Sequence, residues 1–230
     1  FFFRNLLRIQ SDCVLSEFAH VLKNEYGFDT RVITDAAATR SAIMKELNAL
    51  KNRLNSDDRL LIYYAGHGYN DSETETSYWL PVEAEKSDPT NWINAKDITD
   101  QLKRARARQV LLVADSCYSG TISRALDVSL RGRGTRESYL QKMMEKNSRV
   151  LIASGGNEPV SDSGGKGHSI FARVFIESLR NPHEPVFTAE ELLTRQIKEL
   201  VAGRADQTPE YKVIRNSGHD GGDFVFIKRR

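Results

Sequence analysis

The sequence has no long apolar run, little net charge and very few cysteines. None of its hydrophobic stretches approaches the roughly 18 residues that a membrane-spanning helix requires, so no membrane partner is predicted. A formal net charge of +2 over 230 residues is too small to indicate nucleic acid or an anionic membrane as a partner. The two cysteines, Cys13 and Cys117, cannot form a disulfide framework, and we expect a reducing compartment, the cytoplasm.

The same scarcity excludes several kinds of site. A structural zinc site would need more cysteine and histidine. A redox pair would need a cysteine where Gly120 stands, and a cysteine phosphatase loop would need an arginine six residues after Cys117, where Ser123 stands. A phosphate-binding loop ending at residues 165–166 would need a glycine in place of Val160. The sequence therefore predicts neither a metal site nor a cofactor.

What the chain does have is an alternation of apolar runs and helical patterns. Continuous apolar runs, which are typical of buried parallel strands, occupy residues 59–65, 109–115 and 149–154. Shorter β-branched or aromatic runs indicate further strands at 30–34 and 224–227. Apolar residues at helical spacing predict helices at 38–54, 94–105, 169–179 and 188–201. This order predicts one α/β domain with a mostly parallel sheet.

Two motifs follow predicted strands. "YYAGHGY" (63–69) places His67 between two glycines, and "LLVADSCYSG" (111–120) places Cys117 at the end of an apolar run. Because the carboxyl ends of parallel strands share one edge of a sheet, we expect the two residues side by side. An imidazole beside a thiol produces a nucleophilic thiolate. The backbone N–H groups of Gly68 and Cys117 are candidates for an oxyanion hole.

Each of these residues would be structural if it stood alone. A lone buried cysteine usually acts as a small hydrophobe, and a lone histidine at a strand end is usually a satisfied polar residue. Cys13 and His20 fit that interpretation, because both lie in a predicted helix near residues 11–22. The glycines around His67 and the "SCYSG" context of Cys117 favour catalysis instead, and cysteine-dependent acyl transfer, most simply peptide hydrolysis, remains.

These motifs resemble those of a known family. "YYAGHGY" and "VADSCYSG" are similar to the histidine and cysteine motifs of the caspase-like peptidases, a clan that includes metacaspases, gingipains and separase. Residues 154–179 and 218–230 resemble the start of the small-subunit region and the closing strand of many bacterial members. The resemblance implies a caspase–haemoglobinase fold, with a mostly parallel sheet of about six strands flanked by helices on both faces. It also implies that His67 and Cys117 form a catalytic dyad.

The resemblance runs from about Asp12 to the end and implies a single peptidase domain over 1–230. Its parts are a large-subunit-like part (1–122), a basic linker (123–148) and a small-subunit-like part (149–230). Because the chain begins with Phe1 rather than methionine, we expect a fragment of a longer protein. The apolar first strand usual in the family is absent or altered in "FFFRNLLRIQ".

Calcium-dependent metacaspases carry clustered aspartates after the histidine motif and before the helix that precedes the cysteine strand. The latter stretch contains only Asp97 here, so calcium dependence is not supported. Glu83, Glu85 and Asp88 leave it open.

Asp115 bears on substrate specificity. Side chains two apart in a strand share a face, so Asp115 is expected to point the same way as Cys117. A carboxylate there disfavours the thiolate unless a cation sits beside it, and an arginine or lysine of the substrate would supply that cation. The family resemblance adds Asp162 as the second acid of the pocket. We therefore expect a cysteine endopeptidase that cleaves proteins or peptides after arginine or lysine through a thioacyl-enzyme.

The basic linker suggests regulation. It contains Arg131 and Arg133 beside two glycines, and similar families often cut themselves in this interval, so self-cleavage after either arginine is expected. A regulatory domain or partner protein is the other expected control. The alternative function is a caspase-fold scaffold or binding module without peptidase activity.

Overall fold

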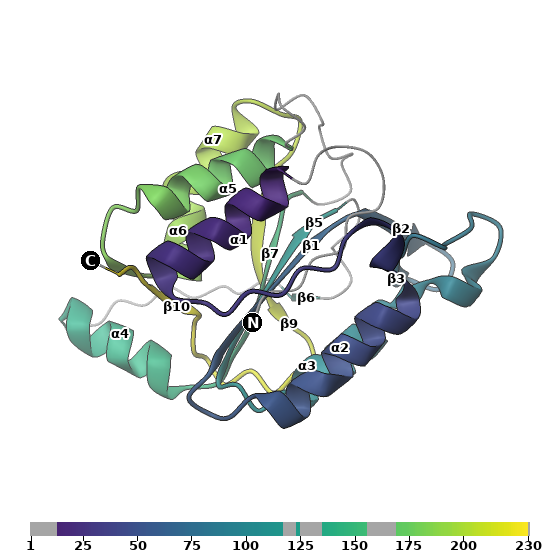
Figure 1. Cartoon of the computed structure of the whole chain (residues 1–230). Helices are drawn as coiled ribbons and strands as arrows, with labels where there is room; N and C mark the ends of the chain where they lie inside the picture. The colour runs from purple at the N-terminus through teal and green to yellow at the C-terminus, as the bar shows by residue number, and fades with distance from the viewer. Residues whose placement is uncertain (1–12, 117–122, 125–134, 156–168, 230) are drawn as a thin grey trace.

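The structure is a computed structural model that describes residues 13–116, 123–124, 135–155 and 169–229 (Figure 1). At its centre the described residues form a five-stranded sheet in the order β1-β5-β7-β9-β6. Its strands are β1 (Arg59–Ala65), β5 (Gln109–Asp115), β7 (Ser148–Ala153), β9 (Glu210–Ile214) and β6 (Ser123–Arg124). The first three are parallel, and β9 runs antiparallel to both β7 and β6. The predicted mostly parallel sheet is confirmed, with five strands described against the expected six or so.

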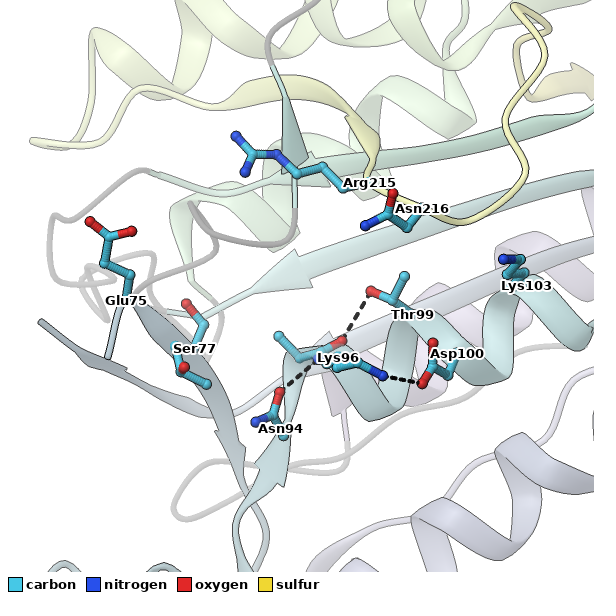
Figure 2. Close-up of a pocket in the computed structure, with 11 residues that line it drawn as sticks. Glu75, Ser77, Asn94, Lys96, Thr99, Asp100, Lys103, Arg215 and Asn216 are labelled. Atoms are coloured by element: carbon cyan, nitrogen blue, oxygen red, sulfur yellow. Dashed lines mark hydrogen bonds and ion pairs between the residues drawn. The ribbon is translucent and has the colours of Figure 1, made fainter. Parts of the chain in front are cut away.

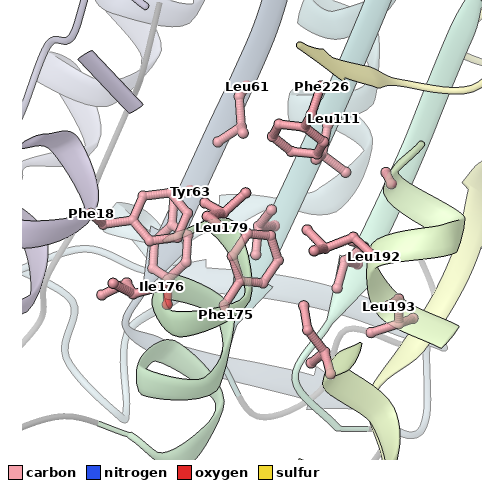
Figure 3. Packing of buried hydrophobic residues seen from close by; sticks show 14 of the residues in the cluster. Phe18, Leu61, Tyr63, Leu111, Phe175, Ile176, Leu179, Leu192, Leu193 and Phe226 are labelled. Atoms are coloured by element: carbon pink, nitrogen blue, oxygen red, sulfur yellow. The ribbon is translucent and has the colours of Figure 1, made fainter. Parts of the chain in front are cut away.

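Helices cover both faces of this sheet. On one face, Tyr63 and Leu111 pack against α1 (Cys13–Tyr26) and α5 (Ile170–Arg180), where the rings of Phe18 and Tyr63 lie 4.6 Å apart (Figure 3). On the other face, alternate strand residues pack against α2 (Arg40–Arg53) and α3 (Ala95–Arg104). Successive strand side chains point to opposite faces, so a strand covered on both sides is apolar throughout. All seven residues of β5 are buried.

The helices begin at polar caps. Thr39 accepts a hydrogen bond from Ala42 N at the start of α2, and Asn94 accepts one from Lys96 N at the start of α3. The predicted helix at 188–201 comprises α6 (Ala189–Leu192), a π-helical turn η4 (Leu193–Ile197) and α7 (Lys198–Ala202), opened by a capping box at Thr188. Two short 3₁₀ turns, η1 (Asp35–Ala37) and η2 (Pro89–Asn91), are also described.

Two strand predictions need correction or refinement. Residues 30–34 form no strand: they lie in an irregular surface segment in which Val32 is 44% exposed, because a short β-branched run without a neighbouring strand does not form a ladder. The closing strand exists as β10 (Val225–Ile227), but it pairs with β8 (Val186–Thr188) in a separate antiparallel sheet rather than joining the central one.

A third sheet follows β1 directly. Its strands are β2 (His67–Asp71), β3 (Thr76–Leu80) and β4 (Ile93–Asn94), all antiparallel to their neighbours. Trp79 on its inner face is 5% exposed and stacks on Tyr64, with ring centroids 4.0 Å apart. The sequence pattern does not predict this sheet. His67 is the first residue of its strand β2.

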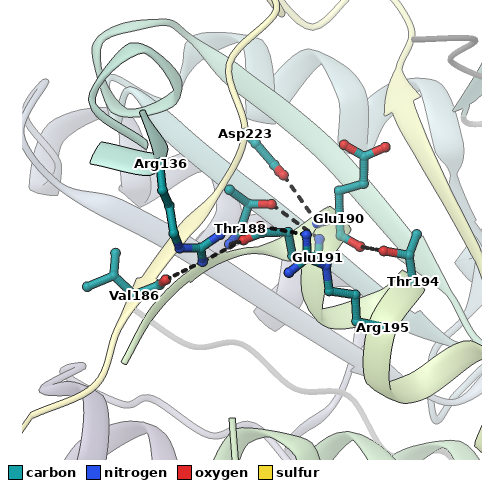
Figure 4. A network of polar contacts seen from close by, with 8 residues as sticks. All are labelled: Arg136, Val186, Thr188, Glu190, Glu191, Thr194, Arg195 and Asp223. Carbon is teal, nitrogen blue, oxygen red and sulfur yellow. Dashed lines mark hydrogen bonds and ion pairs between the residues drawn. The ribbon is translucent and has the colours of Figure 1, made fainter. Parts of the chain in front are cut away.

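The described end of the basic linker is folded onto the domain. Helix α4 (Arg136–Glu145) buries Leu140 and Met143 against Val225. The Arg136 guanidinium donates to both Glu191 carboxylate oxygens, at 2.7 and 3.1 Å, and to the Val186 carbonyl at 2.8 Å (Figure 4). The basic linker therefore contains a helix, while residues 125–134, with Arg131 and Arg133, lie outside the described part.

Candidate active site

The carboxyl ends of β1 and β5 meet at one edge of the central sheet. Ala65 and Asp115, the last residues of the two strands, are register partners. One step further, the Gly66 N–H donates to the Asp115 carbonyl at 3.4 Å. The segment leading to His67 is therefore hydrogen-bonded to the segment leading to Cys117. Cys117 itself lies outside the described residues, so its pairing with His67 stays a prediction.

A buried tyrosine, Tyr64, hydrogen-bonds to the backbone of His67. The Tyr64 hydroxyl donates to the His67 carbonyl at 2.6 Å, while the His67 side chain is exposed. Burial raises the pKa of Tyr64, and a hydrogen bond from the Leu80 backbone to its hydroxyl opposes that rise. Because Tyr64 is 1% exposed and stacked on Trp79, His67 is anchored to the core, with its imidazole directed outward.

Gly66 is required by close packing. A Cβ added at this position would lie 2.8 Å from the Tyr64 hydroxyl oxygen and 2.9 Å from its Cζ, which is closer than real side chains approach. The left-handed backbone occurs at other described glycines, Gly27, Gly218 and Gly221, and not at Gly66. At Gly66 the structure shows that the missing side chain makes room for the ring of Tyr64.

Asp115 is a buried carboxylate, 7% exposed, held by two hydroxyl groups. Its Oδ2 accepts a hydrogen bond from the Tyr63 hydroxyl at 3.0 Å and from the Ser169 hydroxyl at 2.5 Å. Ser169 is also the N-cap of α5, because its Oγ accepts from Ala172 N at 3.0 Å. Asp115 is thus tied both to β1 and to the start of α5. Asp162 lies outside the described residues.

The sequence does not predict Tyr63 and Ser169 as neighbours of Asp115. Ser169 carries a recognisable signal, since a serine before an apolar helical run is a typical N-cap. That signal says nothing about Asp115, which is 54 residues away in the chain. Only the packing of α5 against the sheet brings the two together.

The acidic residues that left calcium dependence open in the sequence take part in local structure. Glu83 Oε1 accepts from the Arg40 N–H at 2.7 Å, at the beginning of α2, and Asp88 caps η2 by accepting from Thr90 N at 2.9 Å. Glu85 forms an isolated bridge with Asp88 and accepts the Trp92 indole N–H on its carbonyl at 2.9 Å. Within the described ranges, no three histidine, cysteine, aspartate or glutamate side chains form a group able to hold a metal ion.

A pocket of about 320 Å³ lies at the other end of the small sheet (Figure 2). Ser77, Lys96, Lys103 and Arg215 are among the residues that line it, from β3, α3 and the segment after β9. In the β2–β3 register His67 pairs with Leu80, at the opposite end from the pocket. This pocket is therefore separate from the candidate active site.

Comparison with known proteins identifies the family. The family model described as the caspase domain matches residues 4–217. The chain belongs to the caspase domain family. That family consists of cysteine peptidases, which act on protein substrates, although some members are inactive.

Three solved structures share its fold. A protein from Geobacter sulfurreducens is 16% identical with a TM-score of 0.62, and the match covers 98% of this chain and 99% of that one. Caspase-1 from Spodoptera frugiperda is 14% identical, with a TM-score of 0.59 and coverage of 100% and 89%. The Drosophila initiator caspase Dronc is 8% identical, with a TM-score of 0.59 and coverage of 97% and 81%. The predicted caspase fold is confirmed by these likenesses.

Among curated proteins, none matches this chain. In the part of the chain that the structure describes, no helix has the length and apolar character needed to cross a membrane.

Proposed function

We propose that this caspase domain is a cysteine endopeptidase that cleaves after arginine or lysine, with His67 and Cys117 as its catalytic pair. The observation that carries the proposal is the common end of β1 and β5, where Gly66 N–H reaches the Asp115 carbonyl. Both motif residues follow within two positions of that contact. The family supplies the chemistry, and the shared strand ends support the pairing.

In the proposed reaction, the Cys117 thiolate attacks the carbonyl carbon of the scissile bond, and the backbone N–H groups of Gly68 and Cys117 stabilise the oxyanion. Collapse of this intermediate breaks the carbon–nitrogen bond, and the His67 imidazolium donates its proton to the departing amine. Water then attacks the thioester while His67 accepts a proton from it. Cleavage of the carbon–sulfur bond releases the acid and regenerates Cys117.

Asp115 supports specificity for a basic residue. Its carboxylate lies at the strand end two residues before Cys117, and hydroxyl groups on Tyr63 and Ser169 hold one of its oxygens. A buried carboxylate attracts a guanidinium or ammonium group strongly, because little solvent screens the pair. Asp162 is proposed as the second acid of the same pocket.

Self-cleavage after Arg131 or Arg133 is the proposed activating step, with a regulatory domain or partner protein as the other proposed control. The hydrogen bonds from Arg136 to Glu191 and Val186 hold the start of α4 to the small-subunit-like part. Because α4 begins at Arg136 and packs on β10, a cut at either arginine would leave α4 attached to the small-subunit-like part.

The test is hydrolysis of a fluorogenic arginine peptide by the wild-type chain and by His67→Ala and Cys117→Ala. We expect each substitution to abolish turnover, and the double variant to be little worse than either, because partners in one step do not lose activity additively. A matched aspartate peptide should not be cleaved. The proposal would be refuted if Cys117→Ala were as active as the wild-type chain, or if the wild-type chain preferred the aspartate peptide. No hydrolysis of any peptide would favour a scaffold.

A further inference from the structure

Three aromatic side chains cluster on the small sheet that begins with His67. The ring of Tyr69 lies 4.9 Å from the Trp92 ring, and the ring of Tyr78 lies 5.4 Å from the same indole. Tyr69 is 42% exposed, one of the most exposed large apolar side chains among the described residues. We call Tyr69, Tyr78 and Trp92 the aromatic cluster.

The aromatic cluster shares a face of the sheet with His67. His67 and Tyr69 are two positions apart in β2, so their side chains point to the same side. Tyr78 on β3 is the register partner of Tyr69 and therefore lies on that side too. The opposite side of β3 is buried, with Ser77 and Trp79 at 3% and 5% exposure. The exposed face thus runs without interruption from His67 to the cluster.

Trp92, which the rings of Tyr69 and Tyr78 both contact, is fixed by hydrogen bonds before anything binds. The Trp92 indole N–H donates to the Glu85 carbonyl at 2.9 Å, and the Trp92 carbonyl accepts from Arg40 Nε at 3.2 Å. An aromatic surface fixed in this way binds an apolar side chain with little loss of conformational entropy.

We propose that the aromatic cluster binds the part of the substrate that follows the scissile bond, and selects a large apolar or aromatic residue at the second or third position after the cut. This inference rests on the proposed function. His67 must approach the leaving amine to within about 3 Å to donate its proton. An extended peptide advances about 3.3 Å per residue, and Tyr69 lies about 7 Å along the strand from His67. The second and third residues therefore reach the aromatic cluster.

The turn beyond the cluster defines what the site should reject. It carries Asp71, Glu73 and Glu75, and both glutamates are exposed. An acidic residue in this part of a substrate would meet like charges, which lowers its affinity. The substrate class is therefore a peptide with arginine or lysine at the cut and an apolar, non-acidic segment after it.

The experiment compares internally quenched peptides that carry arginine at the scissile position and phenylalanine, glycine or aspartate at the second position after it. An arginine coumarylamide, which has no residue after the scissile bond, measures the activity that does not depend on the cluster. We expect kcat/KM for the phenylalanine peptide to exceed that for the glycine peptide by about three- to tenfold, the factor that one aromatic contact supplies, with the aspartate peptide lowest.

Tyr69→Ala should reduce the ratio of kcat/KM for the phenylalanine peptide to that for the coumarylamide by about three- to tenfold. Leu200→Ala is the matched control, because Leu200 on α7 is an apolar side chain of similar exposure, 45%, and should leave both values unchanged. Coumarylamide hydrolysis without preference among the peptides, or an unchanged ratio in Tyr69→Ala, would overturn the subsite alone. No coumarylamide hydrolysis would overturn the peptidase assignment and the subsite with it.

Discussion

Replacing Gly66 with alanine tests whether Tyr64 positions His67. The added Cβ would meet the Tyr64 hydroxyl oxygen at 2.8 Å and its Cζ at 2.9 Å, both well inside normal contact distance. The ring cannot retreat easily, because it is 1% exposed and lies parallel to Trp79 at 4.0 Å. Either the ring or the backbone at residue 66 must therefore move.

The cost follows from three effects. Overpacking a dense core costs about 1–3 kcal/mol. A shift of the ring also weakens its 2.6 Å hydrogen bond to the His67 carbonyl, worth about 1 kcal/mol. The lower entropy of an unfolded chain with alanine offsets about 0.4–1 kcal/mol of this. We expect the free energy of unfolding to fall by about 1–3 kcal/mol.

Activity should fall further than stability implies. His67 follows Gly66 directly, and a displacement of about 1 Å in a catalytic group can cost about 100-fold in rate. Urea unfolding followed by tryptophan fluorescence, together with kcat/KM on the arginine peptide under conditions where the variant is folded, separates the two effects.

The matched control is Gly203→Ala. Gly203 has an ordinary φ of −80°, and its added Cβ would meet one backbone oxygen at 3.2 Å. This variant should change the free energy of unfolding by less than about 1 kcal/mol. If Gly66→Ala were as stable and as active as Gly203→Ala, Tyr64 would not be the element that positions His67.

Ser169→Ala should reduce kcat/KM on arginine peptides by about 5- to 20-fold, because Asp115 loses the 2.5 Å hydrogen bond from the Ser169 hydroxyl. Ser169→Thr keeps a hydroxyl and should retain most of the activity. Equal loss in both variants would contradict the role of this hydroxyl. Burial raises the pKa of Asp223 to about 6 from 3.8, so the folded chain binds this proton more tightly than the unfolded chain. The contribution of Asp223 to the free energy of unfolding, on the order of 3 kcal/mol, is present below about pH 4 and is lost as the pH rises through 6. Urea unfolding between these pH values should show this loss in the wild-type chain and not in Asp223→Asn. Intact-mass measurement over hours should reveal slow cleavage after Arg131 or Arg133, absent in Cys117→Ala. The two fragments should elute together in size-exclusion chromatography, because β5 of one pairs with β7 of the other; equal fragmentation in Cys117→Ala would indicate a contaminating protease.

Much of the fold could be predicted because burial on both faces leaves a strong pattern. Strands β1, β5 and β7 are continuous apolar runs, since helices cover each side of them. The cap at Asn94 could also be placed from local residues, because capping depends on neighbours within three positions. The expectation that the His67 and Cys117 motifs follow adjacent strand ends required only the rule that parallel strands share one edge.

Contacts between distant segments could not be predicted in this way. The run at 30–34 has strand-like residues but no partner strand, and β10 pairs with β8 outside the central sheet. The Tyr64 hydroxyl at the His67 carbonyl depends on how the small sheet folds back over β1, which no local pattern encodes.

The sequence by itself determined the α/β class, the buried strands and the residue types available for chemistry, because these depend on local composition and periodicity. The tertiary structure alone decided which groups meet: Tyr63 and Ser169 on Asp115, and Tyr69 with Trp92 beside His67. Each of these contacts joins residues more than 20 positions apart. Their proximity is a property of helix and sheet packing, which depends on the whole core rather than on any one segment.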